Sequence, residues 1–356
     1  MLQNHSYSID TIIFDVMKTF KLKTLCCQVG FKKQDGYSAS EIVTLMLMFP
    51  LMLLKSINSF YKSEFQKVTS MKKDAIYRLK NNEKMPWRAL LLVFAKQFQH
   101  LVNPQKEIAD KSAFILDDTT HAKTGRRIEQ ISMVFDHVAG RKGSKLGFKN
   151  LTLGLFDSKS FSPLDFSLHS EKPLKKARHR KEQYNKQRHF KSSGAKRIRE
   201  CNVSKIANGL NMLKRAVKQG FRANYVLVDS WFSSHEFIQT VRGLGKKPMH
   251  LICGIRQDAR KYTYKDTPLN ASQLHAVLKS EGGEKRCRKR NTRYFEVIVD
   301  YEGIGKVKLF FCRFPYQKKW RLFLSTNISL NLLSMLEIYS IRWTILSASF
   351  CYAHLL

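Results

Sequence analysis

Apolar residues in the first 105 positions recur with helical spacing, which favours an α-helical packing region. One helix is expected to begin at Ser38 or Ser40 and to end near Pro50, and two more are expected at 73–80 and 87–98. No repeat, metal motif or glycine-rich phosphate loop occurs there. A DNA-contacting role for this region is favoured only by its charge.

From about residue 111 the pattern changes to short apolar or alternating runs, which are typical of strands. Strands are expected at 113–118, 150–156, 163–169 and 225–229, and the second and third are joined by a hairpin. A helix with Ser204 as N-cap and Gly220 as its C-terminal stop is expected before the last of these strands. The order strand, hairpin, helix, strand is that of the ribonuclease H-like fold.

The remainder is again strand-rich, and a helical pattern closes the chain. The expected strands are 249–255, 294–299, 307–312 and 321–324, and the apolar helical positions are Leu332, Leu336, Tyr339 and Trp343. We therefore expect an α/β protein: a ribonuclease H-like core (a mixed sheet with flanking helices), an N-terminal helical region and a β-rich insertion. The expected parts are an N-terminal DNA-binding region at 1–105, the first part of the core at 106–235, the insertion at 236–328 and the start of a C-terminal catalytic helix at 329–356.

Two of the expected strands end on carboxylates. Asp117 and Asp118 follow Phe114-Ile115-Leu116, and Asp229 follows Tyr225-Val226-Leu227-Val228. A single aspartate at a strand end is more often a turn-former than a ligand. Two of them in this order indicate a divalent metal site, in which Asp117 and Asp118 compete for the position of the first acid.

The charge of the chain changes what such a site would act on. Lys and Arg total 63 against 28 Asp and Glu, a formal net charge of +35. An excess of this size indicates a polyanionic partner. Phosphodiester chemistry uses Mg²⁺ or Mn²⁺ held by a few carboxylates together with the substrate phosphate, so both features predict a nucleic-acid enzyme.

A basic segment at 172–200 precedes the strand that ends on Asp229. A run of this kind is usually a loop or a solvated face, but its position favours contacts with the DNA backbone. The candidate DNA-binding residues here are Lys175, Lys176, Arg178, Arg180, Lys181, Arg197 and Arg199.

The cysteines and the longest apolar run indicate the cellular compartment of the protein. Seven cysteines without a CxxC pair fit free thiols in a reducing cytoplasm. No signal peptide is expected at residues 1–15. A helix that crosses a membrane needs about 20 apolar residues, and the apolar run at 43–54 is shorter than that. We expect a cytoplasmic protein with no membrane role.

Three separated segments resemble bacterial insertion-sequence transposases of the DDE superfamily, in the "insertion sequence four" family. They are Ile115-Leu116-Asp117-Asp118-Thr119, Val226-Leu227-Val228-Asp229-Ser230-Trp231-Phe232 and Tyr339-Ser340-Ile341-Arg342-Trp343. The resemblance covers about 111–346 and implies a cut-and-paste transposase, nucleoid-associated in a bacterium, with Mg²⁺ as cofactor. The implied partners are the inverted repeats of its element, target DNA and a second copy of the chain in the DNA complex. Tyr339 and Arg342 are implied to contact DNA phosphate. Asp117 with Thr119 matches an Asp-x-Thr pattern of the family, which implies Asp117 as the first acid and leaves Asp118 as an alternative or supporting acid.

The third motif departs from the family signature, Tyr-x2-Arg-x3-Glu-x6-Lys. Leu346 stands where the family has its catalytic Glu, and Ala353 stands where it has Lys. Residues 345–356 have no charged side chain, which we interpret as a frameshift or premature stop. Glu337 is nine residues from Leu346, on the opposite face if one helix holds both. The expected site is therefore Asp117 and Asp229 without a third acid.

Several aromatic and imidazole side chains near the site allow more than one interpretation. His121, His137 and His169 lack the spacing of metal ligands, so polar surface or supporting roles are expected. Trp231 and Trp320 could stack on an unpaired base. Core packing is the preferred role for Trp231, and Trp320 is left open.

Three functions compete at this point. The first is a DDE transposase that is inactive in this copy, and the second is a DNA-binding remnant that recognises element ends without cutting. The third, an RNA-binding or ribosome-associated protein, explains the charge but not the two aspartates at strand ends.

Overall fold

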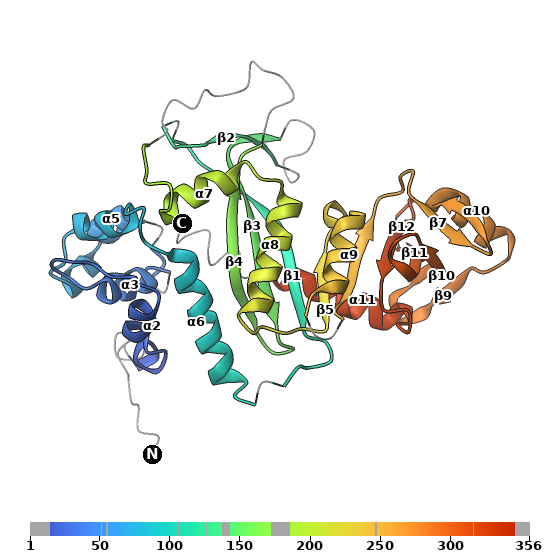
Figure 1. Ribbon diagram of the computed structural model, residues 1–356, viewed down its shortest axis with the longest axis horizontal. Helices are drawn as coiled ribbons and strands as arrows, with labels where there is room; N and C mark the ends of the chain where they lie inside the picture. Colours follow the sequence, from blue (N-terminus) through green and yellow to red (C-terminus); the bar gives the residue numbers. More distant parts are fainter. Residues whose placement is uncertain are drawn as a thin grey trace.

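The computed structural model describes residues 15–50, 52–54, 56–105, 107–125, 127–136, 143–171, 186–245, 248–315 and 317–345. Helices gather at the N-terminal side, a mixed sheet with helices occupies the middle, and a strand-rich part extends from the far edge of that sheet (Figure 1). None of the helices in the described part of the chain has the length and apolar character needed to cross a membrane.

The N-terminal region has a small core of its own. Its α-helices are α2 (Leu22–Gln28), α3 (Ala39–Met48), α4 (Ile57–Tyr61), α5 (Lys73–Lys80) and α6 (Trp87–Val102). Ser38 caps α3 in a capping box with Glu41, as its position predicted. Ile42, Phe60 and Ile76 are completely buried in the core of this region. Helix α6 also packs on the central sheet, so it joins the two parts.

The central sheet has the strand order of a ribonuclease H-like fold. Its strands are β1 (Ala113–Ala122), β2 (Ser132–Phe135), β3 (Ser144–Phe156), β4 (Phe161–His169), β5 (Tyr225–Val228) and β6 (His250–Ile255). Strand β3 pairs antiparallel with β1 and β4, whereas β5 pairs parallel with β1 and β6. The spatial order β4-β3-β1-β5-β6 confirms the expected fold class.

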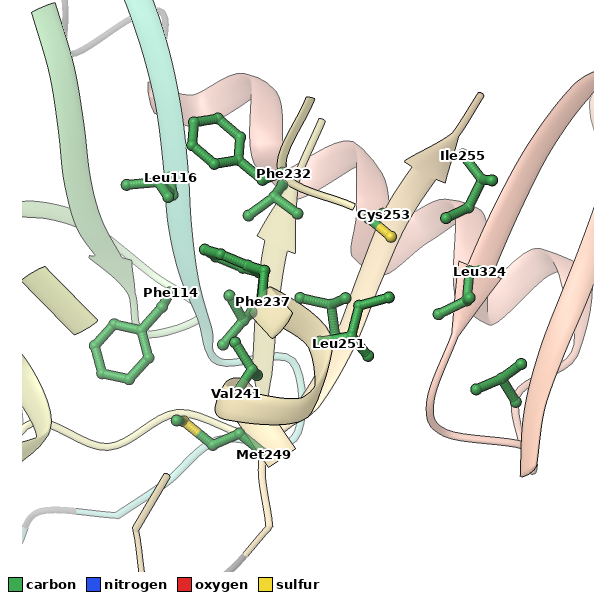
Figure 2. Close-up of a cluster of buried hydrophobic side chains, with 14 of the residues drawn as sticks. Phe114, Leu116, Phe232, Phe237, Val241, Met249, Leu251, Cys253, Ile255 and Leu324 are labelled. Atoms are coloured by element: carbon green, nitrogen blue, oxygen red, sulfur yellow. The ribbon is translucent and has the colours of Figure 1, made fainter. Parts of the chain in front are cut away.

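Helices cover both faces of this sheet because its central strands are apolar on both sides. Helices α8 (Lys205–Lys218) and α9 (His235–Gly243) pack on one face against Leu116 and Val228. Figure 2 shows Phe237 of α9 beside Leu251 and Cys253 of β6 on this face. Helix α11 (Leu332–Ser340) packs on the opposite face, followed by the 3₁₀ turn η6 (Ile341–Trp343).

The strand-rich part is an extension of the same sheet. Its elements are β7 (Lys261–Tyr264), β8 (Thr267–Asn270), α10 (Ala271–Ser280), β9 (Lys285–Cys287), β10 (Thr292–Tyr301), β11 (Gly305–Arg313) and β12 (Arg321–Ser325). Strand β12 pairs antiparallel with both β6 and β11. The described strands therefore form one continuous sheet from β2 to β8.

One element differs from the expected loop. Within the basic segment at 172–200, residues 172–185 lie outside the described part, but Ser193–Cys201 forms helix α7. The Ser192 hydroxyl accepts a hydrogen bond from the Ala195 amide and caps this helix. Basic residues dominate this stretch and obscure the helical spacing of its few apolar residues, Ala195, Ile198 and Cys201.

Candidate active site

Asp117 and Asp229 are brought side by side by the pairing of two parallel strands. Leu116 of β1 is directly opposite Val228 of β5, and each aspartate comes next in its chain. The backbone at Asp229 stays extended, with φ −79° and ψ 179°. Because side chains alternate between the faces of a sheet, both carboxylates lie on the face covered by α11. The preceding residues on that face are Ile115 and Leu227, whose side chains pack on α11.

Backbone amides hold both carboxylates in place. Asp229 accepts a hydrogen bond from the Trp231 amide at 2.9 Å and thereby caps the 3₁₀ turn η4 (Ser230–Phe232). Asp117 Oδ1 accepts a hydrogen bond from the Asp118 amide at 3.0 Å. These bonds leave the other oxygen of each carboxylate for further partners.

Arg342 reaches this pair from η6, immediately after α11. Its Nη1 lies 2.7 Å from Asp117 Oδ2, and the residue is only 8% exposed. The guanidinium lies over the rings of Trp343 and Tyr339, at 4.4 and 5.5 Å from their centroids. Its Nε has no hydrogen-bond partner among the described residues. The Tyr339–Arg342 motif therefore adjoins the two aspartates, and its implied contact with DNA phosphate stays a prediction.

Asp118 lies on the opposite face of the sheet. Its carboxylate pairs with Lys205 Nζ at 2.6 Å, and Lys205 is the first residue of α8. Glu171 is 3.9 Å from the same ammonium group. Asp118 thus pairs with α8, whereas Asp117 shares a face with Asp229, and this arrangement favours Asp117 as the first acid.

Burial sets the protonation behaviour of the site. The pKa of Asp117 is raised to about 6, chiefly by burial; Arg342 opposes the rise, and the nearby Asp229 carboxylate adds to it. Burial also raises the pKa of Asp229, while its bond from the Trp231 amide and Arg342 oppose the rise. The fold therefore buries two neighbouring carboxyl groups whose ionised forms are energetically unfavourable. A positively charged ligand would stabilise the ionised forms.

The donors at this position suit a hard cation but form an incomplete set. Two carboxylates supply oxygen ligands of the kind that Mg²⁺ and Mn²⁺ accept. Among the described residues, no group of three His, Cys, Asp or Glu side chains is placed to hold a metal ion. Leu346, at the position of the family's third acid, lies outside the described residues. Further ligands would have to come from water or from a substrate phosphate.

The candidate DNA-binding residues of the basic segment divide into two groups. Lys175, Lys176, Arg178, Arg180 and Lys181 lie outside the described residues. Arg197 and Arg199 lie on α7. Arg197 faces β4, where its guanidinium is 4.2 Å from the ring centroid of Phe166 and Nη1 donates to the Phe166 carbonyl. Arg199 is exposed and donates to the Phe190 carbonyl at 3.0 Å, so it is the more accessible of the two.

Trp231 corrects one expectation. It is 48% exposed rather than packed in the core, because η4 turns Phe232 inward and Trp231 outward. Lys205 Nζ and the Arg256 guanidinium lie 5.0 and 4.9 Å from its ring centroid. A cavity of about 650 Å³ adjoins these side chains and extends to Ser204 and Arg260.

Sequence reasoning missed Lys205 and Arg256. Lys205 directly follows the predicted N-cap of α8, so its place near β1 could have been anticipated from the fold. Nothing in the local sequence distinguishes Arg256, which follows β6. Trp320, the aromatic side chain left open, packs in the strand-rich part, 4.8 and 5.3 Å from the ring centroids of His275 and Phe295.

Comparison with known proteins identifies the family. No curated protein matches the chain. A family model described as "DDE superfamily endonuclease" matches residues 64–293, more than half of the chain, and this span includes both Asp117 and Asp229. The sheet order is that of the ribonuclease H-like fold, and nuclease or transposase chemistry on DNA is the general activity that the family implies. Its sequence match, together with two aspartates at the ends of neighbouring parallel strands, identifies this chain as a member of the DDE superfamily endonucleases.

Proposed function

We propose that the chain is a DDE-type DNA transposase of the "insertion sequence four" family, acting on the inverted repeats of its own element. The supporting observation is the placement of Asp117 and Asp229 on one sheet face, with Arg342 of the Tyr339–Arg342 motif against them. In this proposal the chemistry is strand cleavage followed by strand transfer to target DNA.

Each residue has a defined part in this proposal. Asp117 and Asp229 would hold Mg²⁺ or Mn²⁺, Asp117 through the Oδ2 atom that pairs with Arg342 in this structure and Asp229 through the oxygen that the Trp231 amide does not bind. When bound there, such a cation would supply activation of the attacking hydroxyl and stabilisation of charge on the phosphate. Arg342 neutralises Asp117 before DNA binds, and it is close enough to bind the scissile phosphate afterwards. Asp118 keeps Lys205 and α8 in position.

The other partners follow from charge and position. Double-stranded DNA, meaning the element ends and the target, binds the basic surfaces, with residues 1–105 as a DNA-binding region. We further propose a dimer in the DNA complex and a cytoplasmic, nucleoid-associated location. The net charge of +35 supports a polyanionic partner.

Activity of this copy is proposed to be very low. Leu346 offers no oxygen at the position of the third acid. Loss of a ligand that stabilises transition-state charge costs several kcal/mol, and each ~1.4 kcal/mol is about tenfold in rate. A DNA-binding remnant that does not cut is therefore the second candidate. It is favoured by Leu346 together with the engagement of Asp117 by Arg342.

The test is a strand-cleavage and binding assay on duplex DNA containing the element's ends. We expect sequence-preferring binding, and cleavage near background with Mg²⁺ or Mn²⁺. Replacing Leu346→Glu alone should not restore cleavage, because Ala353 also departs from the family signature. Robust cleavage by the natural chain that Asp229→Ala abolishes would contradict the proposed inactivity. Failure to bind any DNA would contradict both candidate functions.

A further inference from the structure

Three arginines form a row across neighbouring strands of the strand-rich part. Arg286 of β9 is directly opposite Arg293 of β10, and Arg293 is directly opposite Arg313 of β11. Side chains at directly opposed positions share one face of the sheet, with Cβ atoms about 5 Å apart. Like charges at such positions destabilise a sheet, so folding alone does not account for the row.

A groove with a strong excess of positive charge surrounds this row. It has a volume of about 630 Å³ and is lined by the three arginines together with Lys285, Asn291 and Phe314, among others. Six of the nine residues at 285–293 are Lys or Arg, and the exposed Lys318 and Lys319 follow Arg313 in the chain. The groove is therefore a concave cationic surface and not an isolated cluster of charges.

Few carboxylates neutralise this surface. Glu284 pairs with Arg293, Glu296 lies 3.0 Å from Lys285 Nζ, and Glu337 lies 3.9 Å from Lys289 Nζ. In the described part of the chain, neither Arg286 nor Arg313 has a carboxylate partner; Arg286 donates only to the Asn291 side chain, at 3.3 Å. Two members of the row thus keep guanidinium donors available for an external anion.

We propose that this groove binds the phosphate backbone of duplex DNA. A row of guanidinium groups suits successive phosphate oxygens, which accept charge-assisted hydrogen bonds from arginine. Recognition of single strands normally uses exposed aromatic platforms, whereas Phe314, the aromatic side chain among those that line the groove, is half-buried and packs edge-on against Phe323. The identity of the polyanion as DNA rests on the proposed function.

This surface is separate from the candidate active site. Strands β6 and β12 lie between β5, which ends at Asp229, and the strands β9–β11 of the row. Figure 1 shows β9–β11 displaced along the sheet from β1 and β5. A duplex held here would be a second segment of DNA, or a distant part of the same one, so its binding can be measured without catalysis.

The experiment replaces Arg286, Arg293 and Arg313 together by Gln and measures duplex DNA binding by fluorescence anisotropy in EDTA over a range of salt. We expect affinity at low salt to fall by about tenfold or more, because one charge-assisted hydrogen bond alone corresponds to about that factor. The slope of log K against log salt should flatten by about 0.9 for each phosphate that the variant no longer neutralises. Binding should weaken equally for all duplex sequences, since phosphate contacts position DNA without specifying it.

Matched controls use the same strand-rich part. Replacement of Lys261, Lys279 and Lys306 by Gln also removes three exposed positive charges, but from positions outside the groove. This control should retain affinity and salt slope. Replacing Arg286, Arg293 and Arg313 by Lys should retain most of the affinity for duplex DNA. In thermal unfolding, the variant with three Gln should be at least as stable as the natural chain.

Each outcome decides a separate question. Equal DNA binding by the natural chain and the folded Gln variant would overturn the groove assignment, and so would an equal loss of affinity in the lysine control. A loss confined to single-stranded DNA or to RNA would overturn the assignment of duplex DNA. If the Gln variant fails to fold, the single change Arg286→Gln gives the same test with one arginine. Absence of DNA binding by the natural chain would instead contradict the proposed function.

Discussion

Replacing Asp117 by Asn should stabilise the protein at neutral and alkaline pH. Burial, more than any other cause, raises the pKa of Asp117 from 3.8 to about 6, and Arg342 only partly opposes this. As pH rises through this window, the unfolded chain loses the proton before the folded chain does. Stability therefore falls between these two pKa values, and the full cost is present above pH 6. The difference between them corresponds to about 3 kcal/mol.

The assay is urea unfolding followed by circular dichroism at pH values from 4 to 8. Asp117→Asn should leave the free energy of unfolding unchanged near pH 4 and increase it by up to about 3 kcal/mol at pH 8. Asp118→Asn is the matched control on the opposite face. It removes the 2.6 Å ion pair with Lys205 and should lower stability by about 1.5–3 kcal/mol. An Asp117→Asn variant that is less stable than the natural chain at pH 8 would refute the reasoning.

The same geometry yields three more expected outcomes. Arg342→Gln leaves the buried Asp117 carboxylate without the guanidinium that pairs with it, so the free energy of unfolding should fall by about 3 kcal/mol at pH 8. The loss should be smaller at pH 5, where Asp117 takes up a proton. An equal loss at both pH values would contradict this. Gly147→Ala would place a Cβ 2.0 Å from the His121 carbonyl oxygen, so urea unfolding should show a loss of about 3 kcal/mol; an unchanged midpoint would mean that β1 and β3 can separate. Calorimetric titration without DNA should give only weak Mg²⁺ or Mn²⁺ binding, and tight binding that survives Asp117→Asn combined with Asp229→Asn would place the metal elsewhere.

Local signals in the sequence predicted much of the fold. Ser204 and Gly220 bracket α8, and the apolar run at 225–228 is β5, because capping and burial act over a few residues. Helix α10 was missed within a segment interpreted only as strands. Asn270 and Gln273 form a capping box at the start of α10, and this sequence pattern could have predicted the helix.

The candidate site was only partly accessible from sequence. That Asp117 and Asp229 lie side by side could be predicted, because the ends of neighbouring parallel strands meet at the same edge of a sheet. The Arg342–Asp117 ion pair joins residues 225 positions apart, and no periodicity reports such a contact. Trp231 was misplaced because Asp229 caps a 3₁₀ turn, which ends the alternation of the strand and directs the indole outward.

The hydrogen bonds between β6 and β12 join the strand-rich part to the central sheet through continuous β-structure, not through a flexible linker. Four residue pairs, from Ile252 with Ser325 to Ile255 with Leu322, join these strands. Strand β6 also pairs with β5, so its backbone is bonded on both sides and its amides should exchange slowly with solvent. A hinge at this boundary would require breaking a ladder, not bending a loop. Force applied to the outer strands is therefore transmitted through the sheet to the strand that ends at Asp229.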